Sequence, residues 1–386
     1  MGIRQEQKYR GFEQGPIRPP SEAQSLLIRV TRNCPWNKCT FCSVYKGEQF
    51  SLRPVEHVLR DIDSIYAALT AIQEELDKNP RQPVDQIMLA TGYLTGNQKT
   101  IFYAALDWIS NGNGSVFLQD ANSLILKPDR LTVILNHLKN RFPWISRITT
   151  YARSHTIKRI GETALKQLAA AGLNRIHIGM ESGADRVLAR IHKGVTKQDH
   201  IDAGQIVKRT GIELSEYVMP GIGGSDLSDE HAQETADALN RINPDFIRLR
   251  SLSIQRDSPL FAHYRAGKFS KITDLQTVIE IRKLIENLAG ITSTITSDHV
   301  YNLLYEINGS LPEEQQQILE QIDKFLDLPE NDMLLFQLGR RMGYFHYLEE
   351  LQSPARRAYV NQFYGKFDIT PDNIDRVIEQ NKSDYI

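Results

Sequence analysis

Residues 147–181, RITTYARSHTIKRIGETALKQLAAAGLNRIHIGME, decide the class of fold. Two short apolar runs, RITTYA (147–152) and RIHIGM (175–180), have the length and composition of buried strands. Between them, GETALKQLAAAG (161–172) has helical periodicity and ends at Gly172, a residue type that often closes a helix. Two strands joined by a helix of about 10 to 15 residues predict a parallel βαβ unit.

The same alternation continues on both sides of this unit. About six such units over residues 25–255 predict an α/β fold, either a doubly wound sheet or a complete or partial barrel. Further strands are expected at 25–31, 115–120, 212–219 and 245–252, with 86–91 (QIMLAT) as another candidate. Further helices are expected at 100–109, 129–139, 184–191, 197–211 and 229–242, the last with Asp226 or Ser228 as its N-cap.

The pattern changes after residue 252. Residues 272–386 have almost wholly helical periodicity, and the boundary is expected near Ser258-Pro259. We therefore expect a lead segment (1–24), a core barrel (25–257) and a helical C-terminal region (258–386). The last of these is interpreted as a cap rather than as an independent domain.

Composition narrows the class of partner. The chain has 46 Lys+Arg against 47 Asp+Glu, a net charge of -1, which argues against nucleic acid or an anionic membrane as the main partner. It contains no run of about 18 apolar residues that would span a bilayer, and its N-terminus has no apolar signal core. Three clustered cysteines do not form a disulfide framework, so a reducing, cytoplasmic location is expected.

All three cysteines lie within CPWNKCTFC (34–42), at Cys34, Cys39 and Cys42. A structural zinc site would need a fourth ligand. Nearby His57 lies inside a helix that Pro54, as its first residue, and the apolar spacing from Val58 to Leu69 predict. A plant-type [2Fe-2S] cluster has the same spacing but needs a fourth cysteine, which the chain lacks. Three thiolates can instead hold three irons of a [4Fe-4S] cluster, and the fourth iron is then open to a ligand.

The cysteine segment resembles the cluster loop of the radical S-adenosylmethionine (SAM) superfamily, including the aromatic Phe41 before the last cysteine. It is one residue longer than that superfamily's commonest C-x3-C-x2-C spacing. A second segment, RIHIGMESGADRVLARIHKGVT (175–196), is similar to the branch shared by oxygen-independent coproporphyrinogen oxidase, the methylthiotransferases and the tRNA elongator catalytic subunit. The resemblance covers about residues 20–255 and implies a partial (βα)6 TIM-like barrel with a C-terminal helical cap.

The resemblance also implies the chemistry. One [4Fe-4S] cluster would bind SAM and, after one-electron reduction by a donor such as flavodoxin or ferredoxin, yield a 5′-deoxyadenosyl radical that abstracts hydrogen from a substrate. The protein would orient the reactants and exclude water. Whether such an enzyme acts as an oxidoreductase, a lyase or a transferase stays open.

Candidate ligands of the methionyl end of SAM follow from the resemblance. The segment QDANS (119–123), with Asp120 and Asn122, stands where the family has a Gly-Gly-Glu turn, so Asp120 would accept from the SAM ammonium group. Alternatively, Asp120 only caps a turn. Lys193, with Arg190 as a second choice, would pair with the SAM carboxylate; alternatively both are surface charges.

Candidate ligands of the adenosyl end lie after two later strands. Glu181 ends an apolar strand and would accept from the ribose hydroxyls. The backbone from Tyr217 to Gly221, including Met219, would contact the adenine.

The sixth expected strand provides candidate substrate ligands. Arg248 and Arg250 alternate and would therefore share one face. Arginines inside a barrel favour an anionic, carboxylated or phosphorylated, small-molecule substrate; alternatively they face the helices and pair with acids.

TSDHVYN (296–302) interrupts the helical tail. Asp298 and His299 are candidate acid/base groups and Asn302 a candidate substrate ligand at the barrel mouth. Alternatively a helix starts here, with Ser297 or Asp298 as its N-cap.

The thiol count also excludes alternatives. No cysteine remains for a second cluster, which argues against methylthiotransferase chemistry and favours a single-cluster enzyme. Two rival hypotheses remain: a structural or electron-transfer metal protein, and a radical SAM enzyme that acts on tRNA or another macromolecule.

Overall fold

The computed structural model describes residues 8–112 and 114–381, so the ends of the expected lead and C-terminal segments lie outside it. By its contacts the chain divides into two units. Unit 1 comprises residues 1–37, 44–178 and 203–214, and unit 2 comprises residues 38–43, 179–202 and 215–386. The expected boundaries near residues 24 and 257 stay a prediction. Among the described residues, no helix combines the length and apolar character that crossing a bilayer requires.

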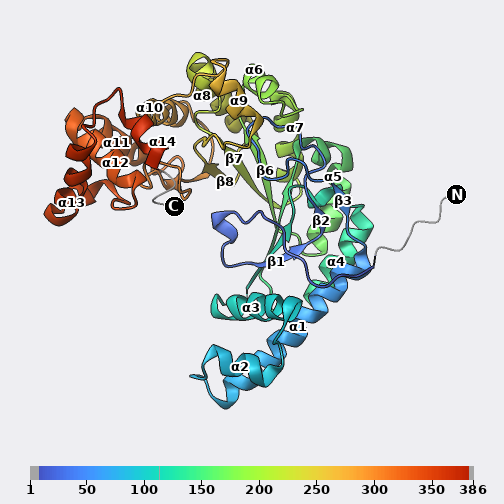
Figure 1. Cartoon of the computed structure of the whole chain (residues 1–386). Coiled ribbons are helices and arrows are strands. Elements are labelled where there is room, and N and C mark those ends of the chain that lie inside the picture. Colours follow the sequence, from blue (N-terminus) through green and yellow to red (C-terminus); the bar gives the residue numbers. More distant parts are fainter. Residues whose placement is uncertain (1–7, 113, 382–386) are drawn as a thin grey trace. The chain divides into compact units, whose positions relative to one another are not determined.

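Unit 1 contains a parallel sheet (Figure 1). Strand β1 pairs with β4, β4 with β5, and β5 with the first half of β6. Ile28, Leu118 and Ile178 are fully buried, as expected of parallel strands that helices cover. The strands of this unit are β1 (Leu26–Arg29), β4 (Ser115–Gln119), β5 (Arg147–Ala152) and, as far as residue 178, β6 (Arg175–Glu181), with a separate pair β2 (Thr31–Arg32) and β3 (Ser51–Leu52).

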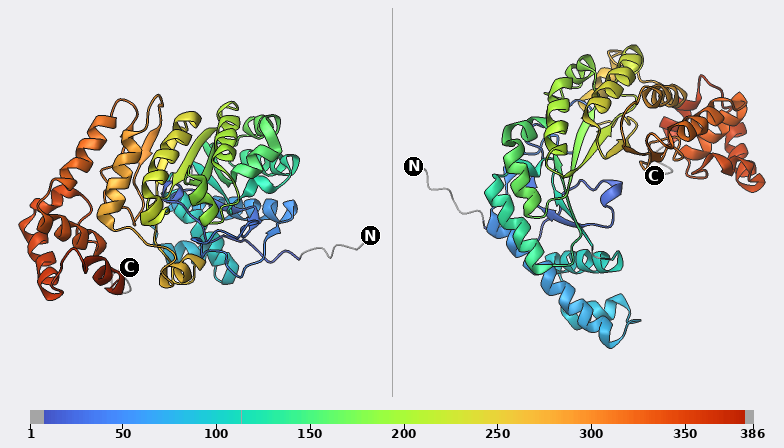
Figure 2. Two further views of the ribbon diagram at one scale, coloured as in Figure 1. Left: turned by 90° about the horizontal axis from the view of Figure 1, so that it is seen from above. Right: turned by 180° about the vertical axis from the view of Figure 1, so that it is seen from behind.

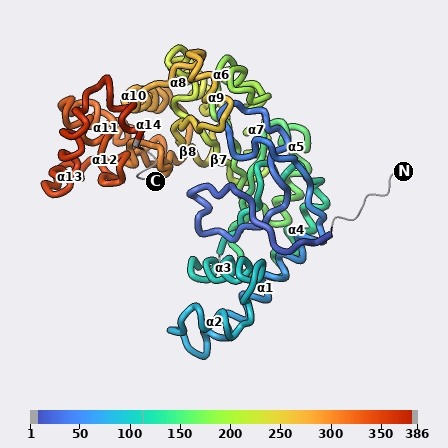
Figure 3. The backbone as a smooth tube through the Cα atoms, viewed as in Figure 1, coloured from blue at the N-terminus to red at the C-terminus, as the bar shows by residue number. Residues whose placement is uncertain are grey.

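Helices α1 and α3 of unit 1 pack along each other, and α4 packs against α1 and α5 (Figure 3). Helix α1 buries Val58, Ile62 and Ile65 at helical spacing, which explains its amphipathic sequence. The helical elements of this unit are η1 (Pro20–Glu22), α1 (Val55–Lys78), α2 (Val84–Thr91), α3 (Gly96–Ser110), η2 (Ser123–Ile125), α4 (Pro128–Arg141) and α5 (Ser154–Ala170).

Unit 2 also contains parallel strands. Strand β7 (Glu213–Val218) pairs with β8 (Phe246–Leu249), and β8 pairs in parallel with β9 (Thr294–Thr296). Strand β10 (Gly309–Ser310) is antiparallel to β9. Helix α8 packs against α6 and α10. The predicted α/β class, with a mostly parallel sheet as in a partial TIM barrel, is therefore confirmed.

The helices after β10 lie beside one another (Figure 2), and α12 contacts both α13 and α14. The helical elements of unit 2, together with α7, are α6 (Asp185–Arg190), α7 (Lys197–Lys208), α8 (Gly224–Ile242), α9 (Pro259–Arg265), α10 (Asp274–Glu286), α11 (Gln315–Leu326), α12 (Glu330–Arg341), η3 (Leu348–Gln352), α13 (Pro354–Lys366) and α14 (Ile374–Asn381).

Three expectations about local structure are wrong. Residues 86–91 belong to helix α2, because a short apolar run does not distinguish a strand from a helix, and Leu89 is exposed. Residues 272–386 are not almost wholly helical, because β9 and β10 interrupt them. Helix α8 begins at Gly224 without a side-chain cap, so neither Asp226 nor Ser228 caps it.

Candidate cofactor site

The first half of the cysteine loop belongs to unit 1. It starts from the antiparallel pair β2–β3, in which Thr31 faces Leu52, so the two ends of the loop are held together. Asn33 and Asn37 have positive φ angles of 66° and 45°, a conformation that asparagine tolerates better than most residues. The backbone N–H of Asn37 donates to Cys34 Sγ at 3.5 Å.

The second half of the loop belongs to unit 2. The N–H of Thr40 donates to Ile191 O at 2.9 Å, and Thr40 O accepts from Leu260 N–H at 2.8 Å. Phe41 packs on an apolar cluster that includes Ile191 and Leu260. Lys193 Nζ lies 6.0 Å from the centre of the Phe41 ring. Residues 38–43 are therefore anchored next to the end of α6.

The cysteines form no disulfide, and all three are half-buried. Cys34 lies in unit 1 and Cys39 and Cys42 lie in unit 2, and the described residues contain no assembled group of three metal-binding side chains. The expectation that the three sulfur atoms share one cluster stays a prediction. The donor set itself fits a [4Fe-4S] cluster, because three accessible thiols can ionise to thiolates, and an N–H group already donates to one sulfur.

Glu181 and Lys193 are brought together in unit 2, as the sequence led us to expect for two ligands of one cofactor. Glu181 ends β6 with φ of 64°, and its Oε1 lies 3.0 Å from Lys193 Nζ. Both side chains are largely buried. A Cβ on Gly179 would lie 2.5 Å from Glu181 Oε1, so the glycine leaves space for this carboxylate.

Arg190 is not part of this arrangement. Its guanidinium donates to both oxygens of Asp226, at 2.8 and 2.6 Å, and to Gly223 O at 2.9 Å. These contacts tie the end of α6 to the start of α8. Between the two expected cations, the geometry therefore favours Lys193.

Asp120 and Asn122 follow β4 in unit 1 and are buried. Asp120 accepts from Tyr45 Oη at 2.6 Å and forms an ion pair with Arg29 at 2.8 Å. Burial and this carboxylate together raise the pKa of Tyr45, so the phenol stays a donor. Asn122 Nδ2 donates to Thr156 Oγ1 at 2.8 Å, and its Oδ1 accepts from Arg153 N–H.

The backbone after β7, expected to contact adenine, is extensively bonded within unit 2. Met219 N–H donates to Glu181 O, and Met219 O accepts from Ile222 N–H. Gly221 N–H donates to Glu280 Oε1 at 2.7 Å. Tyr217 lies within β7, opposite Arg248 on β8.

The two candidate substrate arginines differ. Arg248 is buried and donates to Ser215 Oγ, Thr296 Oγ1 and Asp298 Oδ2, the last at 3.2 Å. Arg250 is exposed and lies beyond the last residue of β8, so the expectation that both arginines alternate on one strand is wrong. Arg248 does pair with an acid, as the alternative interpretation required.

Residues 296–302 form the end of β9 and a turn, and no helix starts at Ser297 or Asp298, so that alternative is wrong. Burial and Arg250 lower the pKa of His299 to about 4, so its imidazole is neutral at pH 7, and its Nδ1 accepts from Tyr301 N–H. The side-chain amide of Asn302 already forms hydrogen bonds within the protein: it accepts from Ser251 N–H and donates to Leu249 O and Ser297 Oγ.

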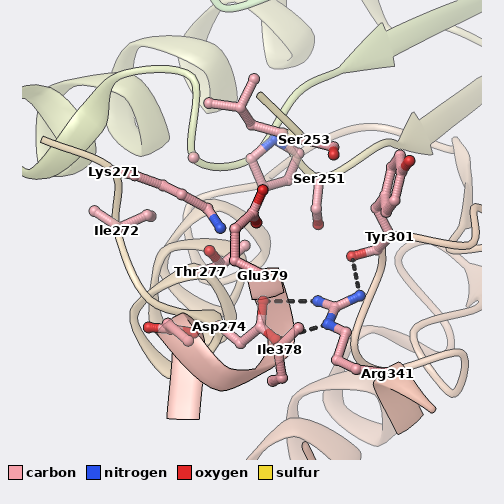
Figure 4. Close-up of a pocket in the computed structure, with 14 residues that line it drawn as sticks. Ser251, Ser253, Lys271, Ile272, Asp274, Thr277, Tyr301, Arg341, Ile378 and Glu379 are labelled. Carbon is pink, nitrogen blue, oxygen red and sulfur yellow. Dashed lines mark hydrogen bonds and ion pairs between the residues drawn. The ribbon is translucent and has the colours of Figure 1, made fainter. Parts of the chain in front are cut away.

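A small pocket lies beside the loops that follow β7 and β8 (Figure 4). Its volume is about 30 Å³, which holds one or two water molecules and is too small for SAM. Of the residues expected to bind SAM or substrate, Pro220 and Gly221 line it, both from the backbone expected to contact the adenine. Ser251, Lys271, Asp274, Tyr301 and Arg341 are among its walls.

Three features escaped prediction from the sequence. Glu216 on β7 is fully buried, and its carboxyl has no hydrogen-bond partner within the described part of the chain. Glu280 and His231 form a buried polar contact. Tyr45 reaches Asp120. In each case the partner comes from a distant segment or is missing, so local spacing carries no signal.

Comparison with known proteins places the sequence of this chain in a family. Residues 28–239 match the model of the Radical SAM superfamily. A tRNA uridine(34) acetyltransferase of Methanocaldococcus jannaschii is 21% identical over 68% of this chain and 48% of its own length. The 4'-phospho-dehydrooxetanocin synthase of Priestia megaterium is 26% identical over 49% of this chain and 22% of its own length. The chain thus spans about half the length of the acetyltransferase.

The solved structures that the chain matches include Elp3 of Methanocaldococcus infernus, with 13% identity, a TM-score of 0.44 and coverage of 60% of both chains. Coproporphyrinogen III oxidase (HemN) from Escherichia coli has 13% identity and a TM-score of 0.44 and covers 68% of this chain and 51% of its own. The family model covers more than half of the residues of this chain, so the chain belongs to the radical SAM superfamily. The enzymes of this superfamily use a [4Fe-4S] cluster and S-adenosylmethionine.

Proposed function

We propose that this radical SAM enzyme binds SAM through Glu181 and Lys193 of unit 2 and holds its cluster through Cys34, Cys39 and Cys42. The observation that carries the proposal is the 3.0 Å contact between Lys193 Nζ and Glu181 Oε1, next to Phe41 of the cysteine loop. Two opposite charges that are largely withdrawn from water form a strong site for a ligand that carries both polar hydroxyls and a carboxylate.

The roles of the two side chains follow from their chemistry. Lys193 has three N–H donors, so it can keep its bond to Glu181 and also donate to the SAM carboxylate. Glu181 can accept from the ribose hydroxyls with its second oxygen. When bound and reduced, the cluster and SAM supply a 5′-deoxyadenosyl radical that abstracts hydrogen from the substrate.

For the substrate, we propose an anionic small molecule that binds near Arg248. This guanidinium is buried, and within the described residues its Nη2 atom makes no hydrogen bond. Asp298 already balances its charge at 3.2 Å, so an anionic substrate would compete with that carboxylate. Neutral His299 can donate from Nε2, because Nδ1 accepts a hydrogen bond, and it cannot act as an imidazolium acid at pH 7.

A tRNA substrate is the second candidate. Two tRNA uridine(34) acetyltransferases and a tRNA-2-methylthio-N(6)-dimethylallyladenosine synthase are among the relatives, which conflicts with our expectation that charge argues against a nucleic acid partner. The net charge of -1 still gives no overall attraction to phosphate.

Anaerobic reconstitution tests the main proposal. With iron and sulfide, the protein should develop a broad absorbance near roughly 400 nm and, after reduction by dithionite or flavodoxin, convert SAM to 5′-deoxyadenosine. Cys39→Ser should lose both signals. Purified protein that holds one zinc and no sulfide would support the structural metal protein instead.

The substrate class is tested on the same reconstituted protein. A desalted metabolite fraction that raises 5′-deoxyadenosine formation supports the small molecule, whereas total tRNA that does so, with an electrophoretic shift at low salt, supports tRNA. Arg248→Lys keeps the charge but loses the planar donor set, so it should weaken stimulation by an anionic metabolite and leave the basal SAM cleavage unchanged.

A further inference from the structure

Asp120 lies at the centre of a buried hydrogen-bond network in unit 1. Its Oδ1 accepts from Tyr45 Oη at 2.6 Å, and its Oδ2 accepts from Arg29 Nε at 2.9 Å and from Asn33 N–H at 3.2 Å. Arg29 Nη2 also lies 2.8 Å from Oδ2. The side chain is fully buried.

These donors come from both flanks of the cysteine loop. Asn33 directly precedes Cys34, and Tyr45 follows Cys42 by three residues. The Asp120 carboxylate therefore holds the entry and the exit of the loop against the end of β4. A charged acceptor that is withdrawn from water makes such bonds strong.

Side-chain bonds within the flanks complete the network. Arg29 Nη2 donates to Asn33 Oδ1 at 3.1 Å, and Asn33 Nδ2 donates to Gln49 O at 2.7 Å. Asn37 Nδ2 donates to Tyr45 O at 2.5 Å, and Lys46 Nζ donates to Asn37 O at 2.8 Å. The flanks are thus cross-linked to each other as well as to Asp120.

The same contacts leave no room for a ligand on Asp120. A carboxylate has about four acceptor positions, and three donors converge on Oδ2 alone. Gly15 covers Oδ1 so closely that a Cβ there would collide with it. We propose that Asp120 is a positioning residue that fixes the cysteine loop for its cluster, and not the acceptor for the SAM ammonium group. This inference rests on the proposed function, because it assumes that the loop holds a cluster.

Release of iron to a chelator tests the proposal on the reconstituted full chain. Tyr45→Phe removes one hydroxyl and should speed the release of iron about tenfold, as the loss of one hydrogen bond to a charged group predicts. Asp120→Asn removes the charge and should speed it further. For the cluster-loaded fraction of Tyr45→Phe and of Asp120→Asn, the Kd for SAM, measured by equilibrium dialysis, should stay within about twofold of wild type.

The chain offers a matched control. Tyr9 Oη donates to Asp61 Oδ1 at 2.7 Å, and Asp61 pairs with Arg53 at 2.6 Å, so the same three residue types form similar contacts around a second carboxylate. The two networks meet at Arg29, whose carbonyl oxygen accepts from Arg53 Nη1 at 2.7 Å. Tyr9→Phe should release iron at the wild-type rate. Thermal unfolding measures the loss of stability in Tyr9→Phe and in Tyr45→Phe. If the two losses are equal, faster iron release in Tyr45→Phe alone is due to the cysteine loop and not to lower overall stability.

Three results would overturn the inference. Wild-type release rates in Tyr45→Phe and Asp120→Asn would remove the positioning role. Equal acceleration in Tyr9→Phe would show a general loosening of unit 1. A wild-type release rate with a weakened affinity for SAM in Asp120→Asn would make Asp120 a SAM ligand. If wild-type protein takes up no iron and sulfide, the proposed function itself fails, which is a separate result.

Discussion

Glu280 Oε1 on α10 lies 3.6 Å from His231 Nε2 on α8, and both side chains are buried. Glu280 also accepts from Gly221 N–H and from the Ser228 hydroxyl, so it joins α10 to the loop after β7 and to α8. Burial raises the pKa of Glu280 to about 7 and lowers that of His231 to about 4. Near neutral pH, the contact therefore joins a neutral imidazole to a carboxyl group that is partly protonated.

The first prediction concerns the pH dependence of stability. Because the pKa of Glu280 is about 7 in the folded chain and 4.5 in the unfolded chain, its favourable contribution is complete below 4.5 and is lost as the pH rises through 7. Glu280→Gln cannot ionise, so its free energy of unfolding should rise relative to wild type by up to about 3 kcal/mol over this range. Urea unfolding near about pH 5 and about pH 8 measures the difference.

His231 acts in the opposite direction, since its contribution to stability is lost as the pH falls through 4. Wild type and Glu280→Gln both contain His231, so its contribution cancels in the difference between their free energies of unfolding. Glu286→Gln on the same helix, exposed and paired with Arg282, is the control and should follow wild type. Parallel pH curves for Glu280→Gln and wild type would contradict the prediction.

The sequence predicts most of the parallel strands because buried strands have continuous apolar runs, as in RIHIGM of β6. Strand β9 is different. It has only three residues, TIT, and its parallel partner Ile247 lies far away in the sequence, so no local pattern indicates it. The strand prediction for QIMLAT fails for a different reason, since a run of four apolar residues fits a strand or a helix.

The site shows the same limit. Glu181 and Lys193 are 12 residues apart, on a strand end and the segment after one helix, so a motif places them together. The partners of Asp120 are 91 and 75 residues away, at Arg29 and Tyr45. The sequence predicts that Asp120 follows a strand. It does not predict that buried donors fill the acceptor positions of this carboxylate, because that depends on how distant segments pack.

The second prediction tests the Glu181–Lys193 pair. Lys193→Met and Glu181→Gln should each raise the Kd for SAM of the cluster-loaded protein about 10- to 100-fold, the expected cost of one hydrogen bond to a charged group. Iron and sulfide content should stay at the wild-type level. Lys197→Met is the matched control, because Lys197 forms a similar pair with Glu234 and Asp237. Unchanged affinity in Lys193→Met would refute the assignment.

The third prediction concerns Glu216. Its carboxyl shares a face of β7 and β8 with Ile247, and burial raises its pKa well above 4.5. Because the folded chain resists ionisation there, Glu216→Gln should be more stable than wild type by about 1 to 3 kcal/mol at pH 7, and the gain should shrink as the pH falls toward 4.5. Chemical unfolding measures it. Glu213→Gln on the same strand, half-exposed and paired with Arg175, should show no such gain. A destabilised Glu216→Gln would contradict this and show that a further group or ligand binds the carboxylate.

The fourth prediction uses the ion pair of α12 and α10. Arg341 donates to both oxygens of Asp274, at 2.8 and 2.7 Å, and to Tyr301 O at 3.0 Å (Figure 4). Both side chains are largely buried. Arg341→Met removes the guanidinium and leaves the largely buried Asp274 carboxylate without this cation, so it should lower the free energy of unfolding by about 3 to 5 kcal/mol.

Arg282 provides the matched comparison, since it binds Asp323 at 2.6 Å but both side chains are well exposed to solvent. Arg282→Met should therefore cost less than about 1 kcal/mol. The double variant Arg341→Met/Asp274→Asn should recover part of the loss, because the second change removes the charge that Arg341 had balanced. Urea unfolding of the three variants gives the values. Equal losses for Arg341→Met and Arg282→Met would contradict the argument, since burial would then make no difference to the strength of these two pairs.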